Sequence, residues 1–306
     1  MKFKSILVDI DVAASVHPAL DRAVRLCRQC DAHLQIVDVV SLRPDATAYL
    51  PVGILEEIVK HRESQLSRIT QSFRDLRIDS HALIGRPADA LIKEVMRSGH
   101  DLLIRAHARD LSTRIPSMYG AVDMELFRKC PCPVWALGPA DGSISPGILA
   151  AVNATGVGPE EQALNVKIID CGLTIAELQQ GSLTILQAHE AISKSILSPH
   201  VSADAYFDYI DKTRKRVREN LKELAASFGS RLNMARIEVR EGVPEEVIPE
   251  FVVSEGIDLV VMGTVARTGI SGLLIGNTAE RLLQRLLCSV LTVKPDGFVS
   301  PVRVDR

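Results

Sequence analysis

The chain has 306 residues, of which 46 % are hydrophobic and 24 % are charged. This length and composition predict two globular domains of ordinary size and exclude a disordered or fibrous protein. A formal net charge of −2 gives no support to nucleic-acid or membrane-surface binding, and six cysteines are too few for a disulfide scaffold.

The beginning of the chain carries no predicted targeting segment. Met1 to Lys4 lead straight into an apolar strand, without the hydrophobic region of a signal peptide. No uninterrupted apolar run approaches the roughly 20 residues that a membrane span needs. We therefore expect a cytoplasmic protein that does not cross a membrane.

In the first 138 residues, short apolar runs alternate with helical patterns. The expected strands lie near residues 5–10, 34–40, 79–84, 101–105 and 133–137. The expected helices lie near residues 15–30, 54–76, 87–98 and 122–129. This alternation, with β-branched residues in the strands, predicts a mostly parallel sheet that helices cover on both faces.

A polar segment bounded by prolines, residues 139–146, is typical of a linker. It divides the chain into domains 1–138 and 147–306. In the second domain the expected strands lie near residues 147–152, 182–188, 235–240, 258–262 and 289–293. The expected helices lie near residues 159–179, 204–228, 244–254 and 278–287.

The second domain repeats the first. Gly85-Arg86-Pro87 returns as Gly242-Val243-Pro244, and Asp101 to Ile104 return as Asp258 to Val261 at the same spacing. With right-handed crossovers, each copy is expected to form a doubly wound parallel-sheet α/β domain. In such domains ligands bind at the carboxyl ends of the strands, at the point where the strand order reverses.

The segment that follows strand 258–262 is the strongest candidate for a binding loop. Glycines punctuate it at Gly263, Gly269 and Gly272, and Gly276-Asn277-Thr278 then opens a helix. A strand that leads into a flexible loop and a helix N-terminus gathers backbone N–H groups around an anion. The sequence therefore predicts an anion site here.

This loop resembles the nucleotide loop of universal stress proteins, Gly-x2-Gly-x9-Gly-[Ser/Thr]. Here it reads Gly263, Ala266, Gly276 and Asn277, so two of the three glycines match. Strings elsewhere extend the resemblance, to tandem members of the E-type branch of this family, over almost the whole chain. They are Gly263-Thr264-Val265, Arg267-Thr268-Gly269, Gly276-Asn277-Thr278-Ala279-Glu280, Gly242 to Pro249, and Arg128-Lys129-Cys130-Pro131. The resemblance implies two domains like the adenine nucleotide alpha hydrolases, with strand order 3-2-1-4-5.

It also implies that the second domain binds ATP or another adenine nucleotide, a small phosphorylated ligand, with Mg²⁺ as the only metal expected. The residues expected to line the site are Ala151, Asn153, Ala188, Met262, Gly263, Ala266, Arg267, Gly276, Asn277 and Thr278. Asn153 replaces the family's adenine-contacting aspartate, and because an amide both accepts and donates, we expect weaker discrimination among bases.

Structural roles compete with these binding roles. Asn277 to Glu280 also fit a capping box, with Asn277 as N-cap and Glu280 three residues later. That arrangement needs no ligand. Arg267 could pair with a phosphate or be a solvated side chain, and the sequence favours the solvated position.

The first domain is expected to be degenerate and mainly structural. Ala106 and Arg109 stand at two of the glycine positions, which removes the backbone freedom and close approach that a phosphate cradle needs. Asp11 stands at the adenine-contacting position, or it is a strand-end aspartate that accepts from a nearby backbone N–H. Cys27 and Cys30 form a C-x-x-C within a helix, as structural thiols or as a metal or redox pair.

Three functions remain open. The leading hypothesis is a non-catalytic stress-survival or regulatory protein whose C-terminal domain binds the nucleotide; the stress role, which includes resistance to DNA-damaging conditions, is implied by the resemblance alone. The alternatives are a weak ATPase and an interaction scaffold without a ligand. We also expect the domains to pair as an intrachain pseudo-dimer through antiparallel strands 133–137 and 290–293, and a homodimer of two chains stays open.

Overall fold

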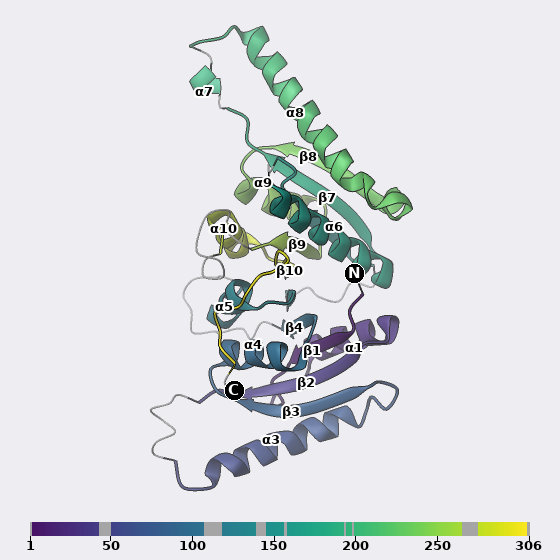
Figure 1. The fold of residues 1–306 in the computed structure, drawn as a ribbon, viewed down its shortest axis with the longest axis vertical. Helices are drawn as coiled ribbons and strands as arrows, with labels where there is room; N and C mark the ends of the chain where they lie inside the picture. Colours follow the sequence, from purple (N-terminus) through teal and green to yellow (C-terminus); the bar gives the residue numbers. More distant parts are fainter. Residues whose placement is uncertain are drawn as a thin grey trace.

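A computed structural model describes residues 2–42, 50–106, 118–138, 145–155, 158–192, 194–197, 199–264 and 275–304 (Figure 1). The strands of the first half are β1 (Ser5–Asp9), β2 (His33–Val40), β3 (Ile78–Ile84), β4 (Leu102–Ala106) and β5 (Val134–Leu137). Those of the second half are β6 (Gly147–Ala151), β7 (Ser182–His189), β8 (Ala235–Glu241), β9 (Leu259–Gly263) and β10 (Ser289–Val293).

The helices follow the strands in both halves. In the first half they are α1 (Pro18–Cys30), α3 (Ile54–Thr70), α4 (Pro87–Ser98) and α5 (Ala121–Lys129). In the second they are α6 (Pro159–Gln179), α7 (Lys194–Leu197), α8 (Ala203–Ala226), the 3₁₀ helix η1 (Gly229–Met234), α9 (Pro244–Ser254) and α10 (Asn277–Arg285). Helices α1, α4, α6 and α9 each begin with a proline, whose missing N–H costs nothing in the first turn.

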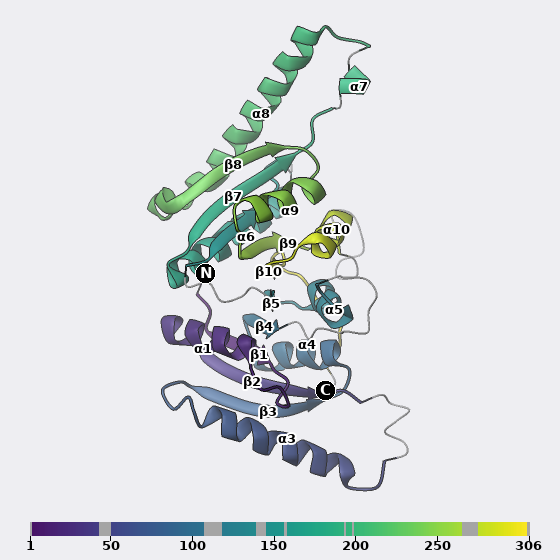
Figure 2. The same cartoon turned by 180° about the vertical axis from the view of Figure 1, so that it is seen from behind.

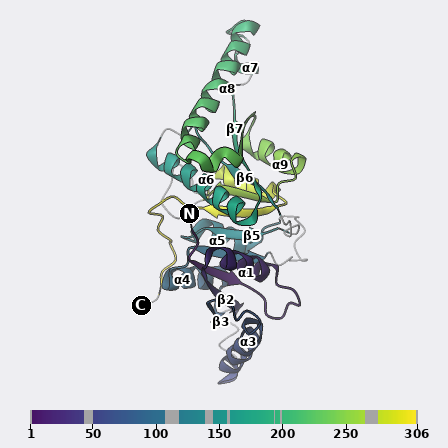
Figure 3. The ribbon, with the colours of Figure 1, turned by 90° about the vertical axis from the view of Figure 1, so that its right-hand side faces the viewer.

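All the strands join one ten-stranded sheet in the order β3-β2-β1-β4-β5-β10-β9-β6-β7-β8. Each half is parallel with the strand order 3-2-1-4-5, so the predicted fold is confirmed. The halves meet where β5 pairs with β10 antiparallel, with Trp135 opposite Leu291. The predicted intrachain pseudo-dimer is therefore confirmed, and the long axis of the molecule runs across the strands from α3 to α8 (Figure 3).

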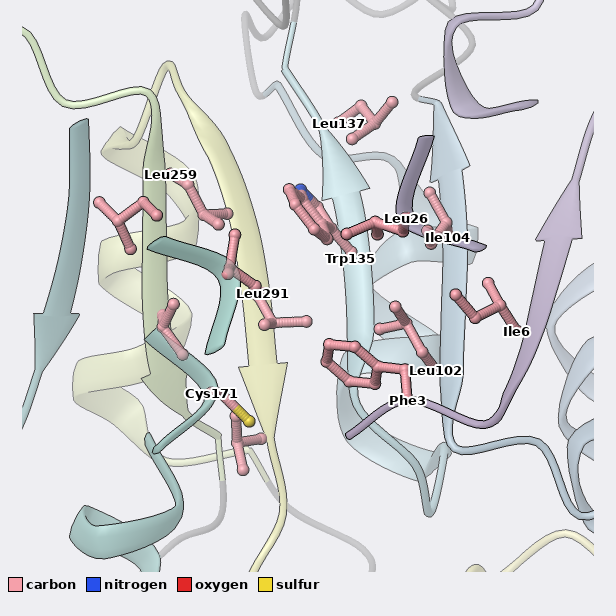
Figure 4. Close-up of a cluster of buried hydrophobic side chains, with 14 of the residues drawn as sticks. Phe3, Ile6, Leu26, Leu102, Ile104, Trp135, Leu137, Cys171, Leu259 and Leu291 are labelled. Atoms are coloured by element: carbon pink, nitrogen blue, oxygen red, sulfur yellow. The ribbon is translucent and has the colours of Figure 1, made fainter. Parts of the chain in front are cut away.

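Alternate strand residues supply two apolar layers, one on each face of the sheet. Ile6 and Val8 point to the face that α1, α3, α6 and α8 cover, and Leu7 points to the face of α4, α5, α9 and α10. Both layers contain residues of both halves. Figure 4 shows the first of them, where Trp135 of β5 and Leu291 of β10 belong to one buried cluster. The hydrophobic core thus continues through the junction.

Polar contacts also cross between the halves. The Arg22 guanidinium of α1 donates to Gln179 Oε1 of α6 at 2.6 Å, and the Tyr119 hydroxyl donates to the Cys288 carbonyl at 2.5 Å. Beyond β10, the chain runs over the first half and ends beside α4 (Figures 1 and 2), where Val302 packs against the apolar layer under α4 and α5. The last segment of the second half therefore covers the first.

Several details differ from the sequence predictions. Helix α1 begins at Pro18, and α3 ends at Thr70 before a series of turns, whereas patterns predicted helix over 15–30 and 54–76. Helices α7 and η1 were not predicted. Residues 139–144 of the expected linker lie outside the described residues. In the part of the chain that the structure describes, no helix is long and apolar enough for a membrane span.

Candidate functional site

The candidate site of the second half lies at the carboxyl ends of β6 and β9. Ala151 and Met262 are register partners on these strands, and Gly263 follows at the end of β9. The Gly276 N–H donates to the Thr264 carbonyl at 3.1 Å, which returns the chain to the strand end after the loop. Ala266 and Arg267, which were predicted to line the site, lie outside the described residues.

The N-terminus of α10 faces this strand end without a side-chain cap from the described residues. Gly276 is the N-cap, and Asn277 and Thr278 are the exposed first residues of the helix. The predicted capping box is wrong, because the helix begins one residue earlier than the box requires. The Glu280 carboxylate accepts instead from Arg128 of α5 at 2.6 Å, across the junction. The first N–H groups of α10 are thus left to other acceptors.

Asn153, at the predicted base-contacting position, is held by a hydrogen-bond network. Its amide Nδ2 donates to Glu161 Oε1 at 2.8 Å, and its Oδ1 accepts from the Thr155 hydroxyl at 2.6 Å and from Gln187 Nε2 at 3.4 Å. Its backbone N–H donates to Asn165 Oδ1 at 3.0 Å, and its carbonyl accepts from Asn165 Nδ2 at 2.8 Å. Every hydrogen-bonding group of Asn153 therefore has a partner within the protein.

Ala188 lies at the rim of the same network. It is buried near the end of β7, and its carbonyl accepts from Gln187 Nε2 at 2.7 Å. Gln187 also accepts from the Ala154 N–H through its Oε1 at 2.5 Å. The segment that follows β6 is thereby fastened to β7.

Gly263 owes its place to packing. Its backbone does not adopt the left-handed conformation. A Cβ built on it would lie 2.8 Å from Cδ2 of Leu164 in α6, which is closer than carbon atoms approach in folded proteins. The glycine therefore leaves room for the Leu164 side chain of α6 at the end of β9.

The equivalent place in the first half is occupied by the protein's own charges. Asp123, in the first turn of α5, accepts from the Gly120 N–H through Oδ2 at 2.9 Å. Arg105, at the end of β4, brings its Nε within 3.0 Å of Asp123 Oδ1 and its Nη1 within 3.7 Å of Asp9 Oδ2. A carboxylate and a guanidinium thus lie together at the N-terminus of α5.

Within this cluster, burial dominates the titration of Asp9. It raises the pKa of the Asp9 carboxyl from 3.8 to about 6, because the charged form loses its hydration. The Arg105 guanidinium opposes this shift, and the neighbouring carboxylates of Asp38, Asp123 and Asp11 add to it. Asp11 itself accepts from the Ala13 N–H at 2.9 Å, which is the local role that the sequence offered as an alternative to a base contact.

The cysteines of the C-x-x-C pair lie on one side of α1. Cys27 is buried, and the Cys30 thiol donates to the Leu26 carbonyl at 3.0 Å. Among the described residues, no group of three or more His, Cys, Asp or Glu side chains could hold a metal ion.

Similar proteins of known family identify the family of this chain. The profile of the Universal stress protein family matches residues 2–138 and 158–294, one copy in each half. The chain belongs to the universal stress protein family. Universal stress protein E of Escherichia coli strain K12 is 31 % identical over 318 residues, covering 99 % of this chain and 98 % of that protein. The Universal stress protein E homolog of Haemophilus influenzae is 32 % identical over 310 residues, covering 96 % and 98 %.

Solved structures agree with the tandem fold. A protein of unknown function from Pseudomonas aeruginosa PAO1 superposes with a TM-score of 0.74 at 27 % identity, over 97 % of this chain and 94 % of that one. A universal stress protein from Archaeoglobus fulgidus superposes with a TM-score of 0.65 over 96 % and 98 %; at 14 % identity it shows the fold alone.

The hydrogen-bond network around Asn153 in this universal stress protein was not predicted from the sequence. Asn165 lies on the buried side of α6, and Gln187 interrupts the apolar run of β7; both are almost fully buried. A polar amide within an apolar pattern was the signal that could have found them, since a buried amide requires hydrogen-bond partners.

Proposed function

We propose that this universal stress protein is a non-catalytic, cytoplasmic stress-survival protein whose second half binds a phosphorylated ligand. ATP or another adenine nucleotide, carried with Mg²⁺, is the first candidate. The observation that carries the proposal is the contrast between two helix N-termini. That of α5 holds the Asp123 carboxylate, whereas that of α10 has no side-chain cap from the described residues. An anion is stabilised at such an end by free N–H groups and the helix dipole.

The network around Asn153 favours recognition through the phosphate more than through the base. A nucleobase at that position competes with Glu161, Thr155 and Gln187 for the Asn153 amide. Each exchange of one hydrogen bond for another contributes little net free energy. We therefore expect modest differences among nucleotides that share a phosphate chain.

A binding role fits the site better than catalysis. Four of the residues at the strand ends, Ala151, Met262, Gly263 and Gly276, carry no titratable or nucleophilic group, and the Thr264 hydroxyl beside them is turned to the Phe127 carbonyl. General acid–base or nucleophilic chemistry needs such groups within hydrogen-bond reach of the substrate. The similarity to Universal stress protein E over nearly the full chain supports the stress role.

Native mass spectrometry of the freshly purified full chain tests the proposal, with Thr278→Asp as the matched variant. Thr278 is exposed in the first turn of α10, so an added carboxylate there stabilises the helix by about 0.3–1 kcal/mol while repelling an anion. We expect one phosphorylated compound per wild-type chain and none on the variant. Absence of any adduct after addition of ATP would favour the scaffold, and repeated turnover of ATP would establish an enzyme.

A further inference from the structure

The last turn of α5 leaves a carbonyl that its own helix cannot satisfy. The Phe127 carbonyl would normally accept from the N–H four residues later, but that residue is Pro131, which has none. Both of its donors come from the second half of the chain. The Thr264 hydroxyl donates to it at 2.9 Å, and the Lys294 ammonium donates to it as well. The second half thus caps a helix of the first.

Lys294 is an unusual residue for this position. It directly follows β10, its exposed fraction is 3 %, and its Nζ also donates to Thr264 Oγ1 at 2.5 Å. The Phe298 ring lies over it, with 4.9 Å from Nζ to the ring centroid. No carboxylate in the described part of the chain comes within ion-pair distance of it. A buried ammonium without a counter-charge is costly, and among the described residues the carbonyl, the hydroxyl, the ring and the helix C-terminus offset that cost.

We propose that Lys294 and Thr264 form a proton-sensitive clasp on Phe127 that sets how tightly the two halves of the sheet close on each other. This clasp lies at the junction of the two halves and does not depend on the proposed ligand. Opening the junction returns the ammonium to water, where it is fully hydrated, and closing it removes that hydration. Protonation of this one side chain therefore works against closure.

The direction of the pH dependence follows from the burial of Lys294. Burial lowers its pKa from 10.5 to about 7 in the closed junction. Between about pH 7 and the ordinary lysine pKa, the opened state binds more protons than the closed state. Opening must therefore become rarer as the pH rises from 7 and more frequent as it falls towards 7. Below about pH 7 both states hold the proton, and this dependence ends.

Other charged or titratable groups surround the clasp on the elements packed against it. They are the thiols of Cys130 and Cys132 after α5, the Tyr119 hydroxyl on the Cys288 carbonyl, the Arg128–Glu280 pair between α5 and α10, and Asp296 paired with Lys167 of α6. In its ionised form, the Cys130 thiolate raises the pKa of Lys294 against the effect of burial. Every variant below keeps the thiols, the Tyr119 hydroxyl and the Arg128–Glu280 pair, and Lys167→Met changes a lysine whose side chain is 26 % exposed.

Hydrogen exchange of the full chain, read by mass spectrometry on peptides that contain β5 and β10, tests the clasp. After correction for intrinsic rates, the opening constant of the wild type should fall about fifteenfold between pH 7 and 8.5, with a slope that approaches tenfold per pH unit above about pH 8. Lys294→Met keeps an unbranched side chain, one atom shorter, and loses the charge, so its opening constant should not share that fall. Lys167→Met removes a lysine from the Asp296 ion pair and should behave as the wild type does.

The same pH slope in Lys294→Met would overturn the proposal, as would its loss in Lys167→Met. A second measurement needs no variant. The NMR titration of the Lys294 side chain in the wild-type protein should show its transition near pH 7. A transition above pH 9 would mean that the ammonium is hydrated, and the clasp would be refuted even if Lys294→Met failed to fold.

Discussion

At the scale of single residues, the site glycines do different work from that expected of a phosphate cradle. Gly263 has ordinary backbone angles, and the contact that excludes a Cβ comes from Leu164 of α6. Gly276 likewise has φ −64° and ψ 141°, which any residue adopts. What distinguishes Gly263 is the space around it, which the Leu164 side chain fills. A glycine in a binding motif can thus serve packing and ligand approach at once.

Gly263→Ala should destabilise the protein by about 1–3 kcal/mol, because the new methyl overlaps Leu164. Leu164→Ala in the same chain should remove the overlap, so the two changes should couple strongly in a double-mutant cycle of urea unfolding. Gly158→Ala is the control, since a Cβ there meets nothing within 4 Å. If Gly263→Ala lowers the free energy of unfolding by the same amount with and without Leu164→Ala, a contact other than that with α6 requires the glycine.

At the scale of elements, the sequence predicted the strands and most helices well because their signals are local. Apolar runs such as Val290 to Val293 are buried on both faces, and prolines mark the first residue of four helices. The repeated Gly-x-Pro strings then placed equivalent elements in each half. Such features depend on neighbours in the chain, which a sequence displays directly.

The predicted capping box was wrong, and the hydrogen-bond network around Asn153 was not predicted, because distant residues decide the local structure at both places. The spacing of Glu280 fits a capping box. Its carboxylate instead accepts from Arg128 of the other half, and the Gly276 N–H donates to the Thr264 carbonyl at the start of α10. Asn153 matched a family position, but its partners Asn165 and Gln187 come from two other elements. Hydrogen bonds between elements are not encoded in any periodicity, so the candidate site was less predictable than the fold.

At the scale of the whole molecule, the two halves form a single body. One sheet and two apolar layers run through the β5–β10 junction, and contacts cross it on both faces, from Arg22 to Gln179 and from Arg128 to Glu280. The linker therefore supplies proximity, while strand pairing and burial hold the halves together.

A protease site inserted within residues 139–144 tests this directly. After complete cleavage the two fragments should still elute together at the size of the intact chain, because the junction no longer needs the linker once formed. The uncleaved insertion variant is the control for any change of shape. Fragments that separate at micromolar concentration would show that the linker, and not the sheet, maintains the pair.

The central claim is that the second half alone offers an anion site, at the N-terminus of α10. Calorimetric titration of the full chain with Mg-ATP tests it most directly, using Thr278→Asp and Val122→Asp, which change the second residue of α10 and of α5. We predict one site per chain, at least about tenfold weaker in Thr278→Asp, or about 1.4 kcal/mol, and unchanged in Val122→Asp. Two sites per chain, no binding at all, or a loss confined to Val122→Asp would contradict it.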